Sequence, residues 1–482
     1  MGSIPDLAAR RAALSPGRLA FTDHETGEDW SFARVDAAAA RLGAALLQRV
    51  PRGARVAILC HNRPEFFVAM FACQKAGLIL APLNWRQPVA ELKPVLDSVA
   101  CALVLHDDTF AEPAAQLGLP VMDLAIPETG PALPPVMVDE DAPWYVLFTS
   151  GTTGTPKAVI QTPRMALANA MNIAQAMGLT SEDRTVNFLP LFHTGGINLF
   201  TLPLFLWGGS SLVLRKFDAP ALVALIAQGA VTQFFGVPAI YQALMQMDLS
   251  GVELGGLRGW ACGGAALPEA TIRFFAERGA PICNGFGMTE TGPTGFLIDR
   301  ASALHKIGSV GKPQMMTEAR LDGVADGAAG AGELLLRGPT VTPGYLDNPQ
   351  ATDASFTADG WLKSGDVAAR DADGYYRIID RIKDMYISGG ENVYPAEVEK
   401  VLIAHPAVLE AAVVGVPDDR WGETGVAFLI ARDGAQIDPA VLGAWLRDRL
   451  AAYKIPRAWH VVADFPRTAA GKVRKPELRK LL

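Results

Sequence analysis

Stretches typical of buried strands and of helices alternate along most of the chain, and this alternation limits the fold more than any other feature. Residues 54–60 (ARVAILC) form an apolar run typical of a buried strand, residues 65–77 have the apolar spacing of a helix, and residues 78–84 form a second apolar run. The same order returns between residues 211 and 247. Alternation of this kind predicts a parallel sheet covered by helices, so we expect an α/β fold for the large N-terminal part.

The pattern changes after residue 380, where a short strand, a glycine turn and a short helix precede two longer strands and a helix at 439–452. The remaining roughly 100 residues are enough for a small independent α+β domain. A chain of 482 residues is also too long for a single core. We therefore expect a large domain at 1–380, a hinge at 381–384 and a small C-terminal domain at 385–482.

Composition excludes several classes of protein. Half of the residues are apolar and 19% are charged, which is typical of a core-rich globular protein, and the net charge of −7 without a basic, aromatic-rich stripe argues against a nucleic-acid partner. Five cysteines without a CxxC pair suit a reducing compartment. The first residues lack a signal-peptide core, and the longest apolar stretch, 197–209, is broken by Pro203 and too short to span a bilayer. A cytoplasmic protein without integral membrane contact is expected.

A loop rich in glycine and hydroxyl residues connects two predicted strands at residues 147–159 (LFTSGTTGTPKAV). Convergent backbone and hydroxyl donors next to a lysine can hold a polyphosphate, whereas the alternative is a flexible surface turn. A Walker loop is disfavoured because Lys157 is followed by Ala158 instead of a hydroxyl residue. The candidate phosphate-binding residues are Thr149, Ser150, Gly151, Thr152, Thr153, Gly154 and Lys157.

Four stretches together resemble the signature motifs of the acyl-adenylate-forming (AMP-binding) superfamily, in the same order. They are YVLFTSGTTGTPKAV at 145–159, NGFGMTETG at 284–292, residues 360–399, and PRTAAGKVRK at 466–475. The superfamily includes acyl-CoA synthetases, aryl-CoA ligases and adenylation domains, and the chain is most similar to feruloyl-CoA synthetase-like and fatty-acyl-CoA ligase-like members. The resemblance implies a large α/β N-terminal domain with sheet layers and a small β-barrel, followed by a small mobile α+β domain. Ala158 and Ser364 depart from the usual glycine and threonine, with similar size and chemistry.

The resemblance also implies an ATP site. The hairpin would hold the β- and γ-phosphates, Thr289 would donate to the α-phosphate, and Glu290 would bind Mg²⁺, which prefers oxygen ligands. Asp366 would accept the ribose hydroxyls with Arg381 as its partner, although a turn aspartate is the simpler interpretation of Asp366. Small residues that let the backbone approach the adenine, and an aromatic residue beside it, are implied at Gly264, Ala265, Asn284, Gly285, Phe286 and Gly287.

Lys472 matches the catalytic lysine of the superfamily, although a lysine in a basic tail is usually only solvated. The resemblance implies that Lys472 joins the acyl carboxylate to the α-phosphate, and that the small domain then swings about Lys383. The loop at Ser388, Gly389 and Gly390 would line a tunnel for coenzyme A. His193 would line the acyl pocket or gate it, with a purely structural role as the alternative.

The remaining pocket walls are Phe235, Gly263 and Met288. These walls are apolar, so an aromatic acid of the hydroxycinnamate or benzoate kind, or a medium-chain fatty acid, fits better than a dicarboxylate. The leading hypothesis is thus an ATP-dependent carboxylate–CoA ligase, an AMP-forming acid–thiol ligase that uses ATP, Mg²⁺ and coenzyme A. The alternatives are a stand-alone adenylation enzyme that loads a carrier protein, and a nucleotide-binding regulator without turnover. A homodimer is left open.

Overall fold

The computed structural model describes residues 2–149, 156–388, 391–447, 449–468 and 471–482, and the chain divides into two compact units. The first unit consists of residues 1–319 and 336–362, and the second of residues 320–335 and 363–482. The domain boundary that we predicted at residue 380 differs from this division, which also assigns residues 320–335 to the second unit. The predicted hinge remains a prediction.

The first unit contains a six-stranded sheet in the order β10-β9-β5-β4-β6-β7. All neighbours are parallel except β9 and β10, which form an antiparallel hairpin. Helix α3 (Pro64–Ala76) packs against α2 (Phe32–Leu47), and every residue of α3 except Glu65 is buried. The strands are β4 (Arg55–Leu59), β5 (Ile79–Pro82), β6 (Cys101–His106), β7 (Val121–Asp123), β9 (Tyr145–Thr149) and β10 (Lys157–Gln161).

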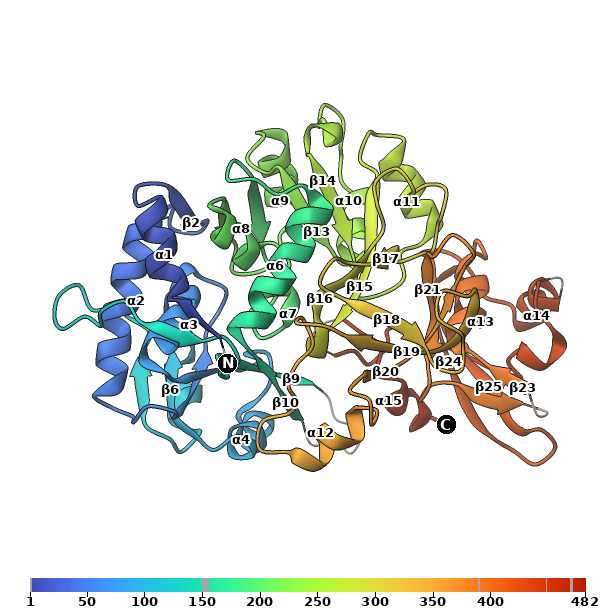
Figure 1. Cartoon of the computed structure of the whole chain (residues 1–482). Coiled ribbons are helices and arrows are strands. Elements are labelled where there is room, and N and C mark those ends of the chain that lie inside the picture. Colours follow the sequence, from blue (N-terminus) through green and yellow to red (C-terminus); the bar gives the residue numbers. More distant parts are fainter. Residues whose placement is uncertain (1, 150–155, 389–390, 448, 469–470) are drawn as a thin grey trace. The chain divides into compact units, whose positions relative to one another are not determined.

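Two further sheets complete the main framework of this unit, with orders β11-β12-β2-β3 and β13-β14-β15-β16-β17. Helices α9, α10 and α11 flank the strands β13 and β14 (Figure 1). The strands are β2 (Leu19–Asp23), β3 (Asp29–Ser31), β11 (Arg184–Asn187), β12 (Ser210–Val213), β13 (Gln233–Gly236), β14 (Gly259–Cys262), β15 (Ile282–Met288), β16 (Gly292–Leu297) and β17 (Lys312–Pro313). The other helices are α1 (Leu7–Leu14), α4 (Val89–Ser98), α5 (Ala111–Ala115), α6 (Pro163–Met177), α7 (Thr194–Asn198), α8 (Thr201–Trp207), α9 (Ala219–Ala227), α10 (Pro238–Met245), α11 (Glu269–Ala276) and α12 (Pro349–Ser355).

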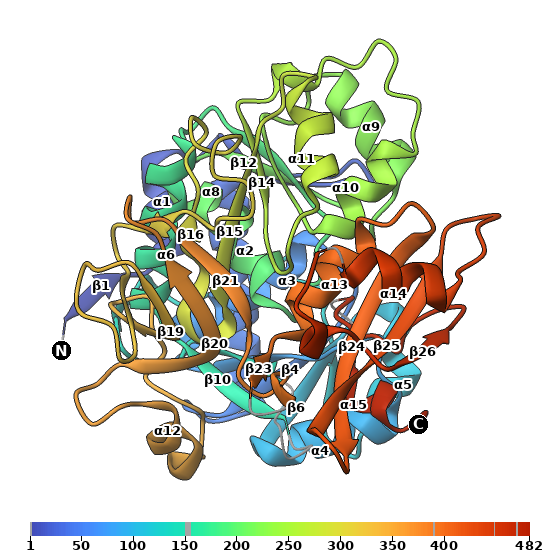
Figure 2. The same cartoon turned by 90° about the vertical axis from the view of Figure 1, so that its right-hand side faces the viewer.

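The second unit holds most of a four-stranded sheet of order β18-β19-β20-β21 and a sheet built on the long hairpin of β24 and β25. Figure 2 shows β24, β25 and β26 side by side. The strands are β18 (Glu318–Leu321), β19 (Gly330–Arg337), β20 (Leu362–Arg370), β21 (Tyr376–Arg381), β22 (Tyr386–Ser388), β23 (Glu391–Val393), β24 (Val408–Asp418), β25 (Gly422–Ala431) and β26 (Ala458–Val461). The helices are α13 (Pro395–Ile403), α14 (Pro439–Arg447) and α15 (Lys475–Arg479).

Most elements follow the sequence pattern, and the differences come from strand pairing. The parallel sheets covered by helices are confirmed, and all five cysteines are free and buried. Residues 113–143 are rich in proline and acidic residues, a composition typical of a surface connection, yet they contain β7 and β8 (Met137–Asp139). These short strands form because β6 and β1 (Ser3–Pro5) supply their backbone partners, which composition alone does not reveal. Among the described residues, no helix has the length and apolarity needed to cross a membrane.

A buried cation fixes the start of the chain to α3. Lys75 is 1% exposed, forms an ion pair with Asp6, and lies 2.6 Å from Asp36 Oδ1. Asp6 also caps α1 by accepting from the Ala9 backbone N–H at 3.1 Å. One ammonium group therefore neutralises two carboxylates, of which Asp6 is fully buried.

We predict that Lys75→Met lowers the unfolding free energy of the first unit by about 3 kcal/mol, because Asp6 loses its counter-charge inside the core. A thermal melt should show a midpoint several degrees lower. Arg18→Gln is the control, since its ion pair with Glu182 is exposed and should change the midpoint little. An unchanged midpoint for Lys75→Met would contradict the anchoring role.

Candidate active site

The predicted phosphate-binding loop lies on the hairpin of β9 and β10. Thr149, the last residue of β9, is the cross-strand partner of Lys157, the first residue of β10. These two candidate residues therefore lie at the mouth of the hairpin. The candidates at its tip, Ser150, Gly151, Thr152, Thr153 and Gly154, lie outside the described residues.

Residues 342–346 connect this hairpin to the turn that carries Glu290. The segment runs along β10: Ile160 N–H donates to Gly344 O at 3.1 Å, and Leu346 N–H donates to Ala158 O at 2.8 Å. At its other end, Thr342 N–H donates to Glu290 O at 2.7 Å. The Gln161 side chain adds a second link, a 2.9 Å hydrogen bond to Thr289 O. The structure thus brings Lys157, Thr289 and Glu290 into one hydrogen-bonded framework.

Tyr345 contacts both charged candidates. Its hydroxyl donates to Glu290 Oε1 at 3.0 Å, and the Lys157 Nζ lies 4.8 Å from the centre of its ring. Glu290 is 7% exposed, so its carboxylate is nearly removed from water. Sequence reasoning missed Tyr345, because residues 338–346 contain Gly and Pro signals that indicate an ordinary loop.

Glycines at the ends of β14 and β15 allow close backbone approach. A Cβ on Gly263 would lie 3.2 Å from Gly285 O, and a Cβ on Gly287 would lie 2.3 Å from the backbone of Pro293. Gly264 follows with φ +83°, a conformation that favours glycine. These strand ends, with Ala265 after them, form the narrow edge at which we predicted the adenine slot.

Asn284 supplies a polar group at this edge. It is 8% exposed, and within the described parts of the chain its Oδ1 has no hydrogen-bond partner. A buried acceptor of this kind is costly unless a donor reaches it, and the amino group of adenine is such a donor. Phe286, two residues on, packs edge-on against Phe296 with ring centres 6.0 Å apart. A buried acceptor with an aromatic ring two residues on fits an adenine nucleotide.

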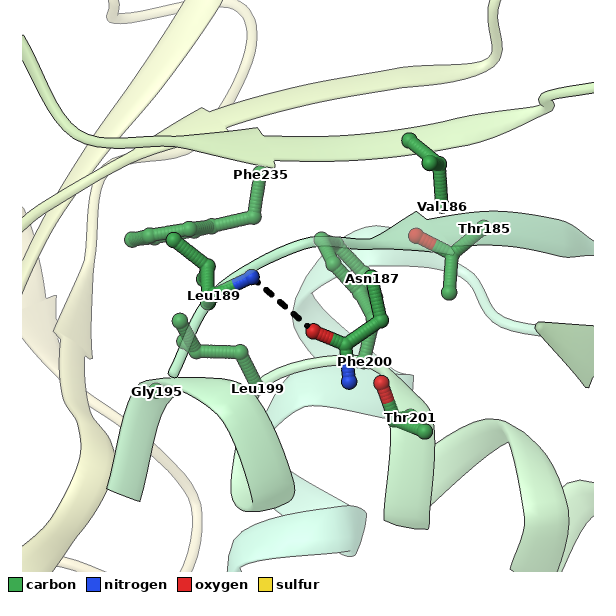
Figure 3. Close-up of a pocket in the computed structure, with 9 residues that line it drawn as sticks. All are labelled: Thr185, Val186, Asn187, Leu189, Gly195, Leu199, Phe200, Thr201 and Phe235. Atoms are coloured by element: carbon green, nitrogen blue, oxygen red, sulfur yellow. Dashed lines mark hydrogen bonds between the residues drawn. The ribbon is translucent and has the colours of Figure 1, made fainter. Parts of the chain in front are cut away.

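A small pocket lies among β11, α7, α8 and β13 of the first unit. Its volume is about 10 Å³, room for roughly one water molecule. Figure 3 shows Phe235 across from Leu189 and Leu199, with Thr185 and Asn187 beyond them. The lining residues are Thr185, Val186, Asn187, Leu189, Gly195, Leu199, Phe200, Thr201 and Phe235.

The predicted acyl-pocket residues are only partly brought together. Phe235 lines the pocket, and its ring tip lies 3.5 Å from the position of a Cβ on Gly263. His193 precedes α7 and packs against Phe192, with ring centres 4.7 Å apart. Met288 precedes the Glu290 turn, where its N–H donates to Thr291 Oγ1 at 3.2 Å. Neither His193 nor Met288 lines the small pocket.

Asp366 and Arg381 face each other in the second unit. They are cross-strand partners on β20 and β21, and Arg381 Nε lies 3.5 Å from Asp366 Oδ1. Asp366 is 5% exposed. Burial raises the pKa of Asp366 above its ordinary value of 3.8, although the charges of Arg381 and Lys472 act in the opposite direction. The carboxylate is therefore held in a place that disfavours its charge, which is typical of a functional site.

Lys472 is exposed, and two hydrogen bonds connect it to Thr468. Thr468 N–H donates to Lys472 O at 2.7 Å, and Lys472 N–H donates to Thr468 Oγ1 at 3.1 Å. Ion pairs hold both sides of the turn: Arg467 with Glu410 at 2.8 Å, and Lys475 with Glu399 at 2.8 Å. Sequence reasoning missed these anchors, because their partners Glu410 and Glu399 are distant in sequence.

The predicted hinge and tunnel residues lie near the end of β21 and on β22. Lys383 is an exposed residue of the turn between these strands, where Asp384 N–H donates to Arg381 O at 3.0 Å. Ser388 ends β22 and is buried. Gly389 and Gly390 lie outside the described residues.

Metal-binding capacity rests on Glu290. In the described parts of the chain, no group of three or more His, Cys, Asp or Glu side chains is placed to hold a metal ion. Mg²⁺ commonly binds one or two carboxylates together with substrate phosphates and water, so a single buried carboxylate fits this ion.

Comparison with known proteins identifies the family. The model of the AMP-binding enzyme family matches residues 8–346, and that of the AMP-binding enzyme C-terminal domain matches residues 397–472. The chain belongs to the AMP-binding enzyme family. This confirms the predicted resemblance and, with the solved structures below, the fold class.

Curated relatives match over their whole length. A feruloyl-CoA synthase from Amycolatopsis sp is 38% identical over 491 residues, which cover 100% of this chain and 98% of the relative. An indoleacetate–CoA ligase from Aromatoleum aromaticum is 35% identical and covers 98% of this chain and 97% of the relative. The expected enzyme class, an AMP-forming acid–thiol ligase, is confirmed by these relatives.

Solved structures also match this chain over nearly its whole length. The o-succinylbenzoate CoA synthetase from Bacillus subtilis, in complex with its acyl-adenylate intermediate, has a TM-score of 0.89 and 30% identity, with 99% of each chain covered. The same enzyme in complex with ATP and magnesium ion also has a TM-score of 0.89 and 30% identity, with 99% of this chain and 100% of that chain covered. The family members with bound nucleotide thus share the fold of this chain.

Replacing Asp366 should have opposite effects on the stability of the second unit and on ligand binding. A buried carboxyl with a raised pKa contributes stability that is fully present below its unfolded-state pKa of about 3.9 and lost as the pH rises through its folded-state pKa. Asp366→Asn should therefore leave the second unit at least as stable at neutral pH. It should weaken the binding of adenosine at least tenfold, because the ribose loses a charged acceptor.

Calorimetric titration with adenosine, which carries no phosphate of its own to titrate, measures this effect. Wild-type affinity should fall as the pH decreases toward the raised pKa of Asp366, and the variant should lack this dependence. Asp373→Asn, an exposed aspartate in the following turn, is the control. Equal adenosine affinity for wild type and Asp366→Asn would show that Asp366 serves only its cross-strand partner Arg381.

Proposed function

We propose that this protein activates an aromatic carboxylic acid of the hydroxycinnamate or benzoate kind with ATP, and then transfers the acyl group to coenzyme A. A carboxylate oxygen attacks the α-phosphorus, pyrophosphate leaves, and the acyl-adenylate is then attacked by the thiol of coenzyme A, which releases AMP. The observation that carries the proposal is the joint presence of Lys157, Glu290, Asp366 and Lys472 in a chain that matches acid–CoA ligases from end to end.

In the first step, two anions must be brought together, so the protein has to neutralise and orient them. We assign Lys157 and the hairpin hydroxyls to the β- and γ-phosphates, and Thr289 to the α-phosphate. Asn284 accepts from the adenine amino group, and Asp366 accepts from the ribose. Glu290 would hold magnesium, and the ion when bound would supply positive charge to the leaving pyrophosphate. Lys472 supplies the charge that stabilises the attacking carboxylate and the α-phosphate.

The second step needs access for a thiol instead of a lysine. We assign Lys383 to the hinge about which the C-terminal part turns, and Ser388, Gly389 and Gly390 to the wall of the tunnel for coenzyme A. Hinge residues absorb a change in backbone angles, which the exposed position of Lys383 permits.

The relatives that act, by name, on feruloyl and indoleacetate groups support an aromatic acid over a medium-chain fatty acid, the other candidate. His193 and Met288 are assigned to the nearer walls of the acyl pocket.

The function is tested by measuring coenzyme A-dependent AMP release with matched acids: 4-hydroxycinnamate, benzoate, octanoate and malonate. The proposal expects release with the aromatic acids and little with malonate, because Phe235 and Met288 would surround its second carboxylate with apolar groups. An acyl-adenylate that forms but is never discharged by coenzyme A would favour the enzyme that loads a carrier protein. ATP binding without AMP release from any acid would favour a regulator.

Lys472→Ala should lower the rate of adenylate formation at least 100-fold, because a charge aimed at the developing transition state is lost. Thioester formation from supplied acyl-adenylate should stay within about threefold of wild type in the same assay. Lys480→Ala, in the same basic tail and paired with Glu477, is the control. Equal loss in both steps would mean that Lys472 has only a structural role.

A further inference from the structure

One side chain, Tyr345, touches both charged residues that we assign to the triphosphate and its metal ion. Its hydroxyl donates to Glu290 Oε1 at 3.0 Å, while the Lys157 ammonium lies 4.8 Å from the centre of its ring. Tyr345 comes from neither motif, since it is 55 residues from Glu290 in sequence and far from Lys157. The hydroxyl of Tyr345 therefore contacts a negatively charged group, and its ring face contacts a positively charged one.

The backbone of Tyr345 is held on two sides. Tyr345 forms an antiparallel bridge with Val159 of β10, and its N–H donates to Thr352 Oγ1 at 3.0 Å. The preceding Gly344 has φ +144°, and a Cβ there would lie 2.5 Å from the Thr352 side chain. Strand pairing on one side and close contact with α12 on the other thus fix the backbone from which the Tyr345 side chain projects.

The two contacts differ in a way that suits a binding site. A carboxylate offers about four lone-pair sites, and the hydrogen bond from one hydroxyl uses a single one of them, so this bond by itself does not prevent the carboxylate from binding a cation. A ring face attracts an ammonium through its quadrupole without taking up a defined hydrogen bond, so the lysine donors can still reach phosphate. Tyr345 can therefore hold the Glu290 carboxylate and the Lys157 ammonium in place while both still bind a ligand.

The protonation state of Tyr345 agrees with this arrangement. Burial, followed by the charge of Glu290, raises the pKa of Tyr345 to about 12. The hydroxyl therefore remains a hydrogen-bond donor throughout the neutral pH range.

We propose that Tyr345 is a positioning residue that orients Glu290 for the magnesium ion and Lys157 for the phosphates before MgATP arrives. The inference rests on the proposed function of these two residues. Because the hydroxyl serves the carboxylate and the ring serves the ammonium, the two contributions can be separated by mutation.

The experiment compares Tyr345→Phe, which keeps the ring and removes the hydroxyl, with wild type in calorimetric titrations. The Kd for MgATP should rise about tenfold, as expected for the loss of a hydrogen bond to a charged group, while the Kd for AMP without magnesium stays within about twofold. The magnesium concentration needed for half-maximal ATP binding should rise with it. Tyr345→Leu should weaken MgATP further, because it also removes the ring under Lys157.

A double mutant links the effect to Glu290. In a Glu290→Gln background, Tyr345→Phe should cost no further MgATP affinity, because its partner is already neutral. Tyr241→Phe is the matched control: its hydroxyl also makes a buried hydrogen bond, to Ala261 O at 2.7 Å, but it does not touch Glu290 or Lys157. It should leave the magnesium dependence unchanged.

Three results would overturn the inference: an unchanged magnesium dependence in Tyr345→Phe, an equal loss of AMP and MgATP affinity, or additivity with Glu290→Gln. Thermal melts of each variant identify any loss of MgATP affinity that comes from unfolding. If Tyr345→Phe is destabilised, the comparison of Glu290→Gln with the double mutant decides whether Tyr345 acts through Glu290. Failure of the proposed function is distinguishable, since in that case the wild-type protein itself would not bind MgATP.

Discussion

The antiparallel pairing of residues 342–346 with β10 is the constraint on which the proposed phosphate site depends. It ties the strand that begins at Lys157 to the turn that carries Glu290, through backbone hydrogen bonds and not through flexible side chains. Backbone pairing inside a folded core holds groups more precisely than loops do. A lysine and a carboxylate from distant parts of the sequence are thereby kept within reach of one tyrosine.

The remaining candidate groups are buried at a cost that a ligand would offset. Asn284 keeps an acceptor without a partner in the described structure, and Asp366 is a carboxylate whose pKa is raised by burial. Both arrangements weaken the folded protein slightly, that of Asp366 despite its contact with Arg381, and become more favourable when a further donor arrives. An adenine amino group and ribose hydroxyls are donors of the required kind, so each of the two groups suits the adenine nucleotide that we propose as the ligand.

The sequence predicted the elements that depend on local patterns of apolar residues. It missed the contacts that depend on how distant strands pair. Alternation between residues 54 and 84 was sufficient for the parallel sheet, because each apolar run is short and bounded by helical spacing. The partnership of Asp366 with Arg381 was implied by resemblance, and only the pairing of β20 with β21 places them opposite each other. Tyr345 was missed because its importance arises from contacts with residues that are distant in sequence. The ion pairs that hold the Lys472 turn were missed for the same reason.

The central claim is that the acid is joined to AMP before it meets coenzyme A, and isotope transfer tests it most directly. An aromatic acid labelled with heavy oxygen in both carboxylate positions is turned over with ATP and coenzyme A, and the products are weighed by mass spectrometry. Our account predicts one labelled oxygen in AMP and the other in the thioester carbonyl. Label in the released phosphate or pyrophosphate, or unlabelled AMP beside labelled thioester, would contradict it.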